Sequence, residues 1–195
     1  MKVLTIAAHP RKDSLTFSTL HRFVQGLKDA GHETEVLDLY RSGFDPVLRE
    51  ADEPNWTASN QHFSPEVERE IKRMNQHDAL AFIFPLWWWS MPAIMKGYID
   101  RVWNYGVAYG PNKLAHEHVL WISLAGAPVE RFQKRKYDKM MEHYFNVGLA
   151  DYVGIPSSKF ELFYETIKGE PGNIDEILKR SYDLGLNYTK YQVMN

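Results

Sequence analysis

Short runs of apolar residues recur along the chain and are typical of strands buried on both faces. Residues 2–8, 79–85 and 118–126 form such runs, rich in branched or aromatic side chains and bounded by polar or turn-forming residues. Residues 32–40 alternate between apolar and polar positions more strictly, which predicts an outer strand of the same sheet.

Between these runs, apolar residues recur with the period of an α-helix. The segments with this pattern are residues 16–31, residues 64–78, the stripe from Met91 to Val102, and residues 134–149 and 174–191. Gly31 is a typical stop for the first helix, and Ser64 followed by Pro65 is a typical start for the second. Asn173 is predicted to cap the last helix.

The alternation of strands and helices predicts an α/β fold, with an open parallel sheet covered by helices on both faces and joined by right-handed crossovers. Residues 41–63 interrupt this pattern as a long polar segment of turn-forming residues, and loops of that length are usually functional. Because no internal repeat or second boundary is evident, we expect residues 1–195 to form a single domain.

Composition narrows the function classes. The chain has 195 residues, a formal net charge of −2 and no cysteine. The charge balance provides no general attraction to nucleic acid or anionic membranes, and the lack of cysteine excludes disulfides, thiolate nucleophiles and cysteine metal sites. The longest apolar run, residues 79–89, is far below the roughly 20 residues that span a bilayer. We expect a cytoplasmic protein with no nucleic-acid partner, no membrane insertion and no metal.

The residues that follow each predicted strand are the most informative, because ligands of open parallel sheets bind at the carboxyl ends of the strands. The segment AAHPRKDSLTFS follows the first strand and leads into a helix, and Arg11 and Lys12 give it positive charge. The groups that could bind phosphate are the free N–H groups of the first helical turn, the imidazole of His9 and the hydroxyls of Ser14, Thr16 and Ser18. A capped surface turn explains the same residues equally well.

The next two strand ends differ in character. Three consecutive tryptophans, Trp87 to Trp89, follow Pro85, and small residues at 125–127 follow the fourth strand. A broad aromatic wall, a backbone that a ligand can approach closely and a phosphate-type loop together match the shape of a flavin nucleotide. Two alternatives explain the tryptophans without a flavin: they could belong to the hydrophobic core, or they could form a platform on which sugars stack.

Five segments carry a resemblance to a known family: AHPRKDSLTFS, FDPVLREAD, HFSPEV, FPLWWWSMPAIMKGYIDRVWNYGVAYG and VGLADYVGI. They resemble the flavodoxin-like NAD(P)H quinone oxidoreductases, the family of DT-diaphorase, and also the ancillary oxidoreductases of glutathione-gated potassium efflux systems. The resemblance implies a flavodoxin-like fold, an open parallel five-stranded sheet with strand order 2-1-3-4-5.

The resemblance also implies site residues. In addition to Ser14, the residues implied to bind the flavin are His9, Thr16, Phe17 and Ser18 at its phosphates, Pro85, Leu86, Trp87, Trp88 and Trp89 along its ring, and Ser123, Leu124, Ala125 and Gly126 at the fourth strand. Trp88 and Trp89 would align the reactants, and Tyr109 would reach the ring site of a partner subunit. Trp87 stands where relatives have glutamine, and Tyr137 is a possible stand-in for a family tyrosine that steadies charge on the flavin.

The implied activity is that of a flavin-dependent NAD(P)H oxidoreductase that passes hydride through bound flavin to a quinone or similar acceptor, as a homodimer with sites at the interface. FAD is the implied flavin, with FMN as the alternative. The alternative function is a regulatory ancillary subunit of a potassium efflux transporter. A one-electron flavodoxin is disfavoured, because flavodoxins tend to be strongly acidic and this chain has a net charge of only −2. The basic residues 131–139 are typical of a solvated helix face, with attraction of NAD(P)H phosphates as the other interpretation.

Overall fold

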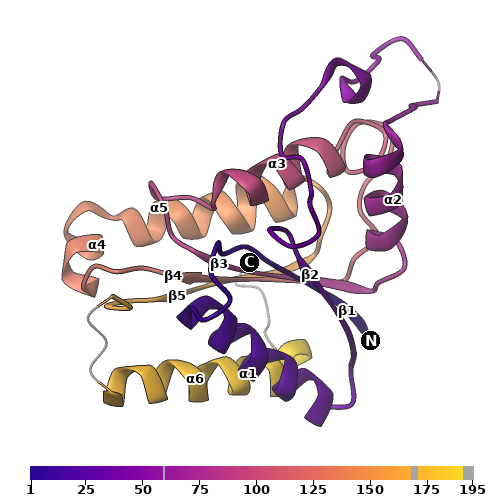
Figure 1. The fold of residues 1–195 in the computed structure, drawn as a ribbon. Helices are drawn as coiled ribbons and strands as arrows, with labels where there is room; N and C mark the ends of the chain where they lie inside the picture. The colour runs from indigo at the N-terminus through magenta and orange to yellow at the C-terminus, as the bar shows by residue number, and fades with distance from the viewer. Residues whose placement is uncertain (59, 168–170, 191–195) are drawn as a thin grey trace.

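Five parallel strands form the centre of the protein in a computed structural model that describes residues 1–58, 60–167 and 171–190 (Figure 1). The strands are β1 (Lys2–Ala7), β2 (Glu33–Asp38), β3 (Ala79–Pro85), β4 (His118–Leu124) and β5 (Ser157–Phe163). Their order in the sheet is β2-β1-β3-β4-β5, and every neighbouring pair is parallel. This confirms the predicted sheet, with β2 at one edge as expected.

Helices cover both faces of the sheet. The helices are α1 (Leu15–Asp29), α2 (Pro65–Met74), α3 (Ala93–Val102), α4 (Val129–Arg135), α5 (Tyr137–His143) and α6 (Pro171–Leu186), with short 3-10 turns at Glu50–Asp52 and Tyr188–Lys190. α1 and α6 lie on one face, and α2, α3 and α5 lie on the other (Figure 1). Side chains of β1 alternate between two apolar clusters, since Val3 and Ala7 pack toward α1 and Leu4 and Ile6 pack toward α3. Within the described parts of the chain, no helix is long and apolar enough to cross a bilayer.

The prediction of one continuous helix over residues 134–149 is wrong, because the chain forms separate helical segments there. α4 ends at Arg135, and Lys136 adopts a left-handed conformation with φ of 56° before α5 begins at Tyr137. The chain then continues as a π-helix over Tyr144–Asp151. A lysine does not ordinarily signal a helix stop, because most non-glycine residues avoid positive φ, so the apolar period alone could not reveal the break.

The predicted cap of the last helix is also wrong. α6 begins at Pro171, so Asn173 lies inside the helix, and its side-chain amide donates to the carbonyl of Glu165 at 3.4 Å. Proline is favoured in the first helical turn because its missing N–H would have no partner there. The helix ends at Leu186, five residues before the predicted end at Tyr191, which lies outside the described residues.

Residues 41–63 are tied to α3 by a buried ion pair. Asp52 and Arg101 are 0% and 3% exposed, and the Arg101 guanidinium donates to the Asp52 carboxylate at 2.7 and 3.2 Å. Ser64 stands at the N-cap of α2 as predicted, but its hydroxyl donates to Asp52 at 3.0 Å and makes no capping bond to α2. Asn104, just after α3, donates to the Asp52 carbonyl at 2.7 Å. One carboxylate therefore anchors the long loop, α2 and the end of α3.

Candidate functional site

The carboxyl ends of β1, β3 and β4 meet at one edge of the sheet. β1 lies between β2 and β3, so the chain reverses its direction of travel across the sheet at the β1/β3 pair. Ligands of open parallel sheets bind at this kind of reversal. The three loops that follow these strands, residues 8–14, 86–92 and 125–128, therefore define the candidate site.

The first loop has the backbone of an anion site. Ser14 caps α1, with its hydroxyl accepting from the N–H of Phe17 at 3.3 Å, and the hydroxyl of Ser18 donates to the Ser14 carbonyl at 3.4 Å. Two of the three hydroxyls predicted to bind phosphate therefore serve the helix start. The N–H groups of Leu15 and Thr16, in contrast, donate to no other described residue. They are the groups left for an anion.

Arg41 holds this loop in place, a role that the sequence analysis missed. Its guanidinium donates to the carbonyls of His9 and Pro10, both at 2.6 Å, and lies 5.3 Å from the centre of the Phe17 ring. The carboxylate of Asp38 pairs with it at 3.4 Å. Arg41 follows the end of β2, so the rule that directs attention to strand ends would have found it.

The tryptophans occupy a strained tight turn. Trp87 and Ser90 exchange backbone hydrogen bonds of 3.0 and 3.1 Å, and the two residues between them, Trp88 and Trp89, have φ of 51° and 63°. Turns with positive φ at both central residues normally carry Asn-Gly or Gly-Gly. The turn leaves the side chain of Trp88 93% exposed. A large apolar ring is therefore held out of the core at an energetic cost, as is common at binding sites.

The ring of Trp89 packs against two aromatic side chains of α4 and α5. Its ring stacks on Tyr137 of α5 with a centroid distance of 4.0 Å and an interplanar angle of 26°, and Phe132 of α4 meets it edge-on at 5.5 Å. Tyr137 thus supports Trp89 and is not among the residues that line the neighbouring cavity. This placement does not match the role of a residue that steadies charge on a bound ring.

A cavity of about 690 Å³ opens between the tryptophan turn and the loop after β4. It is lined by Leu86, Trp88, Trp89 and Phe132, by Ala125, Gly126, Ala127 and Pro128 of the loop after β4, and by the three exposed residues Arg131, Glu165 and Ile167. Cavities of a few hundred Å³ with mainly apolar walls and a few polar groups are typical of small-molecule and cofactor sites.

The loop after β4 offers backbone donors to this cavity. The carbonyls of Ala125 and Ala127 accept from the N–H groups of Thr166 and Glu165, at 3.1 and 3.2 Å. The N–H groups of Gly126 and Ala127 donate to no other described residue. A Cβ at Gly126 would lie 2.2 Å from the Cδ1 of Ile167, which is the end of a flexible and 82% exposed side chain, so a side chain here would require only that Ile167 move.

The structure brings five of the predicted ring-site residues together around the cavity: Leu86, Trp88, Trp89, Ala125 and Gly126. Pro85, Ser123 and Leu124 lie within β3 and β4, and the side chains of the last two are buried in the sheet. Trp87 turns toward the first loop, where its ring lies 6.5 Å from that of His9. Trp87 therefore joins the phosphate-type loop to the ring cavity and does not line the cavity itself.

Tyr109 lies elsewhere. It belongs to the connection from α3 to the start of β4, at the amino-terminal edge of the sheet, opposite the tryptophan turn. There it packs with Tyr105, Tyr152 and Trp56, with ring centroids 5.8 to 6.5 Å from its own. Burial raises the pKa of the Tyr109 hydroxyl, and the nearby Tyr152 and Tyr105 raise it further, so this group stays protonated at neutral pH. Within one chain, Tyr109 is separated from the cavity beside Trp88.

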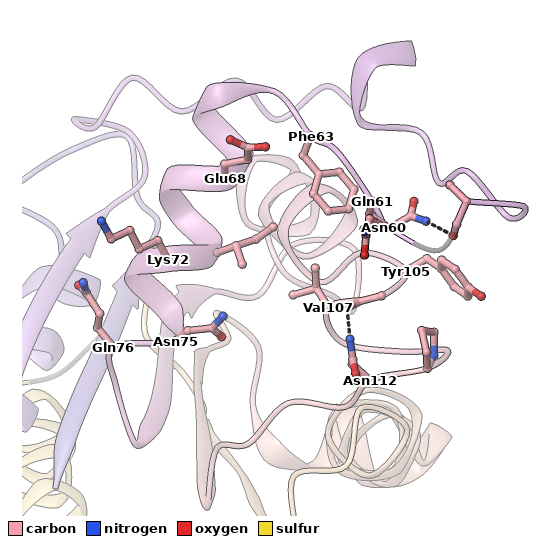
Figure 2. Close-up of a pocket in the computed structure, with 14 residues that line it drawn as sticks. Asn60, Gln61, Phe63, Glu68, Lys72, Asn75, Gln76, Tyr105, Val107 and Asn112 are labelled. Carbon is pink, nitrogen blue, oxygen red and sulfur yellow. Dashed lines mark hydrogen bonds between the residues drawn. The ribbon is translucent and has the colours of Figure 1, made fainter.

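A second cavity, of about 760 Å³, lies at this opposite edge between α2 and the turn that carries Gly106 and Val107 (Figure 2). Amide side chains line much of it, among them Asn60, Gln61, Asn75 and Asn112. The Asn112 amide donates to the Gly106 carbonyl at 2.7 Å, and Gln61 is bonded to residues of its own loop. None of the predicted site residues lines this cavity.

Comparisons with known proteins agree with the observed fold. The sequence profile of the flavodoxin-like fold family matches residues 1–183. The chain is 38% identical over 167 residues to the "Uncharacterized NAD(P)H oxidoreductase YcaK" of Escherichia coli (strain K12), with 85% of each protein covered. It superposes on an NAD(P)H:quinone oxidoreductase from Methanothermobacter marburgensis with a TM-score of 0.84 at 31% identity, with 97% of both chains covered.

Two longer relatives match over 55% of this chain. They are the NAD(P)H dehydrogenase (quinone) 1 of Cavia porcellus, 32% identical with 45% of its length covered, and the ribosyldihydronicotinamide dehydrogenase (quinone) of Homo sapiens, 31% identical with 53% covered. The chain thus spans about half the length of these two relatives. Three findings indicate the same family: the strand order, the profile match and the relatives that align over most of the chain. The chain belongs to the flavodoxin-like NAD(P)H quinone oxidoreductase family.

Proposed function

We propose that this chain is a flavin-dependent oxidoreductase that takes hydride from NAD(P)H and passes it to a quinone or a similar acceptor. The observation that carries the proposal is the meeting of three loops at one sheet edge: a helix start with free N–H groups, an exposed tryptophan turn and a backbone with free donors. Relatives named as oxidoreductases of NAD(P)H and quinones support it. None of the relatives described above is named for a transporter.

The residues of the site fit a flavin nucleotide. The unpaired N–H groups of Leu15 and Thr16 suit its phosphate end, because the helix start also carries a partial positive charge. The unpaired N–H groups of Gly126 and Ala127 suit the polar edge of a ring system. The contact between His9 and Trp87 makes these two regions continuous. A bound flavin would supply the hydride chemistry, which no side chain around the cavity can supply.

The chain's own residues have positioning and electrostatic roles. Trp88 and Trp89 form an apolar wall that orients flat reactants and excludes water from the cavity. The free N–H groups of the loop after β4 would stabilise negative charge on a flavin bound in the cavity. Arg41 keeps the first loop in the shape that leaves the N–H groups of α1 accessible.

The proposal includes FAD as the flavin, with FMN as the alternative, and a cytoplasmic homodimer as the working form. Trp56 and Tyr152 support the homodimer, because they leave 64% and 56% of their surface exposed around Tyr109, at the edge away from the cavity of the same chain. In a dimer this aromatic group would cover the open cavity of the partner subunit.

Two measurements test the proposal. The purified protein is incubated with FAD or FMN, the bound flavin is released by heat and identified by chromatography, and oxidation of NADH and NADPH is followed with a neutral quinone. We expect a yellow protein that binds FAD and turns over with the quinone. A protein that binds neither flavin, or that binds flavin without oxidising NADH or NADPH, would contradict the proposal.

A further inference from the structure

We propose that Arg131 forms an anion subsite at the edge of the flavin cavity and selects donors that carry a phosphate on the nicotinamide ribose over donors that lack it. This inference rests on the proposed function, since it concerns the donor that enters the same cavity. It assigns a specificity role to one residue of the basic stretch 131–139.

The position of Arg131 supports this role. It lies in the first turn of α4, directly after the loop that follows β4, and lines the cavity of about 690 Å³ together with Trp88 and Trp89. Most of the other lining residues are apolar or small, and Arg131 is the one cation among the described residues that line the cavity. Arg135, one helical turn further along α4, does not line the cavity.

The charge of Arg131 has no partner within the described parts of the chain. Its side chain makes no ion pair, hydrogen bond or ring contact with another described residue, although its backbone N–H donates to the Pro128 carbonyl at 3.2 Å. Among the described residues, Lys139 pairs with Glu142 at 2.8 Å and Arg180 pairs with Glu161 at 2.9 Å. The side chains of Arg131 and Arg135 have no such partner among the described residues, and of these two only Arg131 lines the cavity. An unpaired guanidinium beside an apolar cavity is ready to bind an anion, and its planar fork suits a phosphate in particular.

The shape of the donor directs that anion to the edge of the cavity. A reduced nicotinamide ring is flat and uncharged, so the aromatic wall of Trp88 and Trp89 suits it. The first charged group along NADH or NADPH is the phosphate on the ribose next to that ring. With the ring against the wall, this phosphate falls toward the rim, where Arg131 stands. Ribosyldihydronicotinamide, for which one of the relatives is named, ends at the ribose and has no such group.

Glu165 acts against this attraction. It lines the same cavity, is exposed, and is fixed through its backbone by a hydrogen bond to the Ala127 carbonyl at 3.2 Å. A carboxylate near the rim repels a phosphate, so the two charged residues set the affinity for the anion in opposite directions. Glu165→Gln is therefore expected to lower KM for NADH and NADPH, while Arg131→Gln raises it.

The test compares donors with and without phosphate in the flavin-loaded protein. Steady-state rates are measured with NADH, NADPH and ribosyldihydronicotinamide, with one neutral quinone as acceptor, for the wild type, Arg131→Gln, Arg131→Lys and Arg135→Gln. We expect Arg131→Gln to lower kcat/KM for NADH and NADPH about five- to tenfold, mainly through KM, because an exposed charged contact contributes only modestly to binding. The rate with ribosyldihydronicotinamide is expected to stay unchanged.

The other variants separate the subsite from general effects. Arg135→Gln removes the same charge from the same helix and is expected to change kcat/KM less than twofold for every donor. Arg131→Lys is expected to retain most of the preference for donors with phosphate, since the charge remains. An equal loss with all three donors in Arg131→Gln, or equal losses in the Arg131 and Arg135 variants, would overturn the subsite. Failure of the wild type to oxidise any of the donors would instead overturn the proposed function.

Discussion

At the scale of single residues, the tryptophan turn raises the question of why a protein keeps two of its bulkiest side chains in a conformation that suits glycine and asparagine. Trp88 and Trp89 both have positive φ, and for L-residues this region costs roughly 1 kcal/mol or more per residue. Trp88 recovers none of this through burial, since it is 93% exposed. The remaining explanation is that the ring is needed at the cavity that it lines.

Replacement of Trp88 is therefore expected to raise the stability of the protein and lower its activity. In Trp88→Asn, we expect the free energy of unfolding to rise by about 0.5–1 kcal/mol, because asparagine tolerates positive φ and little apolar burial is lost. Quinone reduction is expected to fall about three- to tenfold in kcat/KM, as the loss of one aromatic contact predicts. Urea denaturation and steady-state kinetics on the same preparations measure both quantities.

Trp87→Asn is the matched control, because Trp87 neighbours the turn but does not have a positive φ. No gain in stability is expected from it. If Trp88→Asn is less stable than the wild type, or if both variants gain the same free energy of unfolding, the turn is not under the strain that we infer.

Asp52 is a buried carboxylate whose pKa is set by its hydrogen-bond donors. Burial by itself would raise the pKa of this carboxyl, but the hydrogen bonds from the Ser64 backbone N–H, the Arg101 guanidinium and the Ser64 hydroxyl outweigh burial and lower it. The folded state thus binds the proton less readily than the unfolded state. The resulting stabilisation is present above the usual carboxyl pKa, near pH 4, and is lost as the pH falls through the lower folded value.

Asp52→Asn is expected to weaken this acid dependence. At neutral pH we expect a loss of about 3–5 kcal/mol, because Arg101 is left buried with part of its charge uncompensated. Between about pH 5 and pH 3 the variant should lose stability less steeply than the wild type. Denaturant midpoints across this pH range measure the effect, with Asp175→Asn on the exposed surface of α6 as the control. A variant with the wild-type acid slope would show that Asp52 does not carry the pH dependence.

At the scale of elements, α1 and α6 meet through two glycines. A Cβ at Gly26 would lie 2.2 Å from the carbonyl oxygen of Tyr182, and a Cβ at Gly185 would lie 2.1 Å from the carbonyl oxygen of Phe23. Both obstacles are backbone atoms, which cannot rotate out of the way as the end of a side chain can. The two helices can therefore approach this closely only where neither has a side chain.

Alanine at either glycine is expected to push the helices apart. We expect Gly26→Ala and Gly185→Ala to lose about 2–3 kcal/mol each in urea denaturation, despite the better helix propensity of alanine. Gly148→Ala is the control, since its nearest obstacle is a Tyr144 ring carbon at the ordinary distance of 3.6 Å. Tolerance of alanine at Gly26 and Gly185 would mean that α1 and α6 can separate without cost.

The elements also show how far the sequence could lead. β1, β3 and β4 were predictable because each is a short apolar run that a buried parallel sheet requires, and β2 because its apolar and polar positions alternate. β5, with the sequence SSKFELF, is not such a run, and a fifth strand was expected only from the family resemblance. The strand-end rule then led to the tryptophan turn. The break at Lys136 was not predictable, because it depends on a left-handed lysine. The same limit applies to the site: Ser14 and Ser18 have the composition of a phosphate loop, but only the structure shows that their hydroxyls serve the helix cap.

At the scale of the whole molecule, the separation of Tyr109 from the tryptophan turn bears on whether two copies of the chain assemble into a dimer. The two features lie at opposite edges of one sheet, so Tyr109 can contribute to a ring cavity only in a second copy of the chain. The proposed dimer makes each site from residues of both subunits. A site of this kind can be repaired by mixing two variants that are each defective, provided that their defects fall on different subunits of the same site.

Mixing Trp88→Ala with Tyr109→Ala is therefore expected to restore activity. Each variant alone would have a defect in every site, whereas in mixed dimers one of the two sites contains neither substitution. After subunit exchange at equal concentrations, about a quarter of all sites would be intact, so quinone reduction should rise above the rate of the unexchanged mixture by up to about a quarter of the wild-type rate. The rate is measured before and after exchange under mild denaturant, and the dimer is followed by analytical ultracentrifugation.

The control mixture combines Trp88→Ala with Trp89→Ala, whose substitutions fall on the same loop and the same cavity. No mixed dimer of this pair contains an intact site, so no recovery is expected. If the Trp88 and Tyr109 variants also fail to recover after proven exchange, the loss in Tyr109→Ala arises within its own chain. Tyr109 would then act through its contacts with Tyr105, Tyr152 and Trp56, as part of the packing that supports the start of β4.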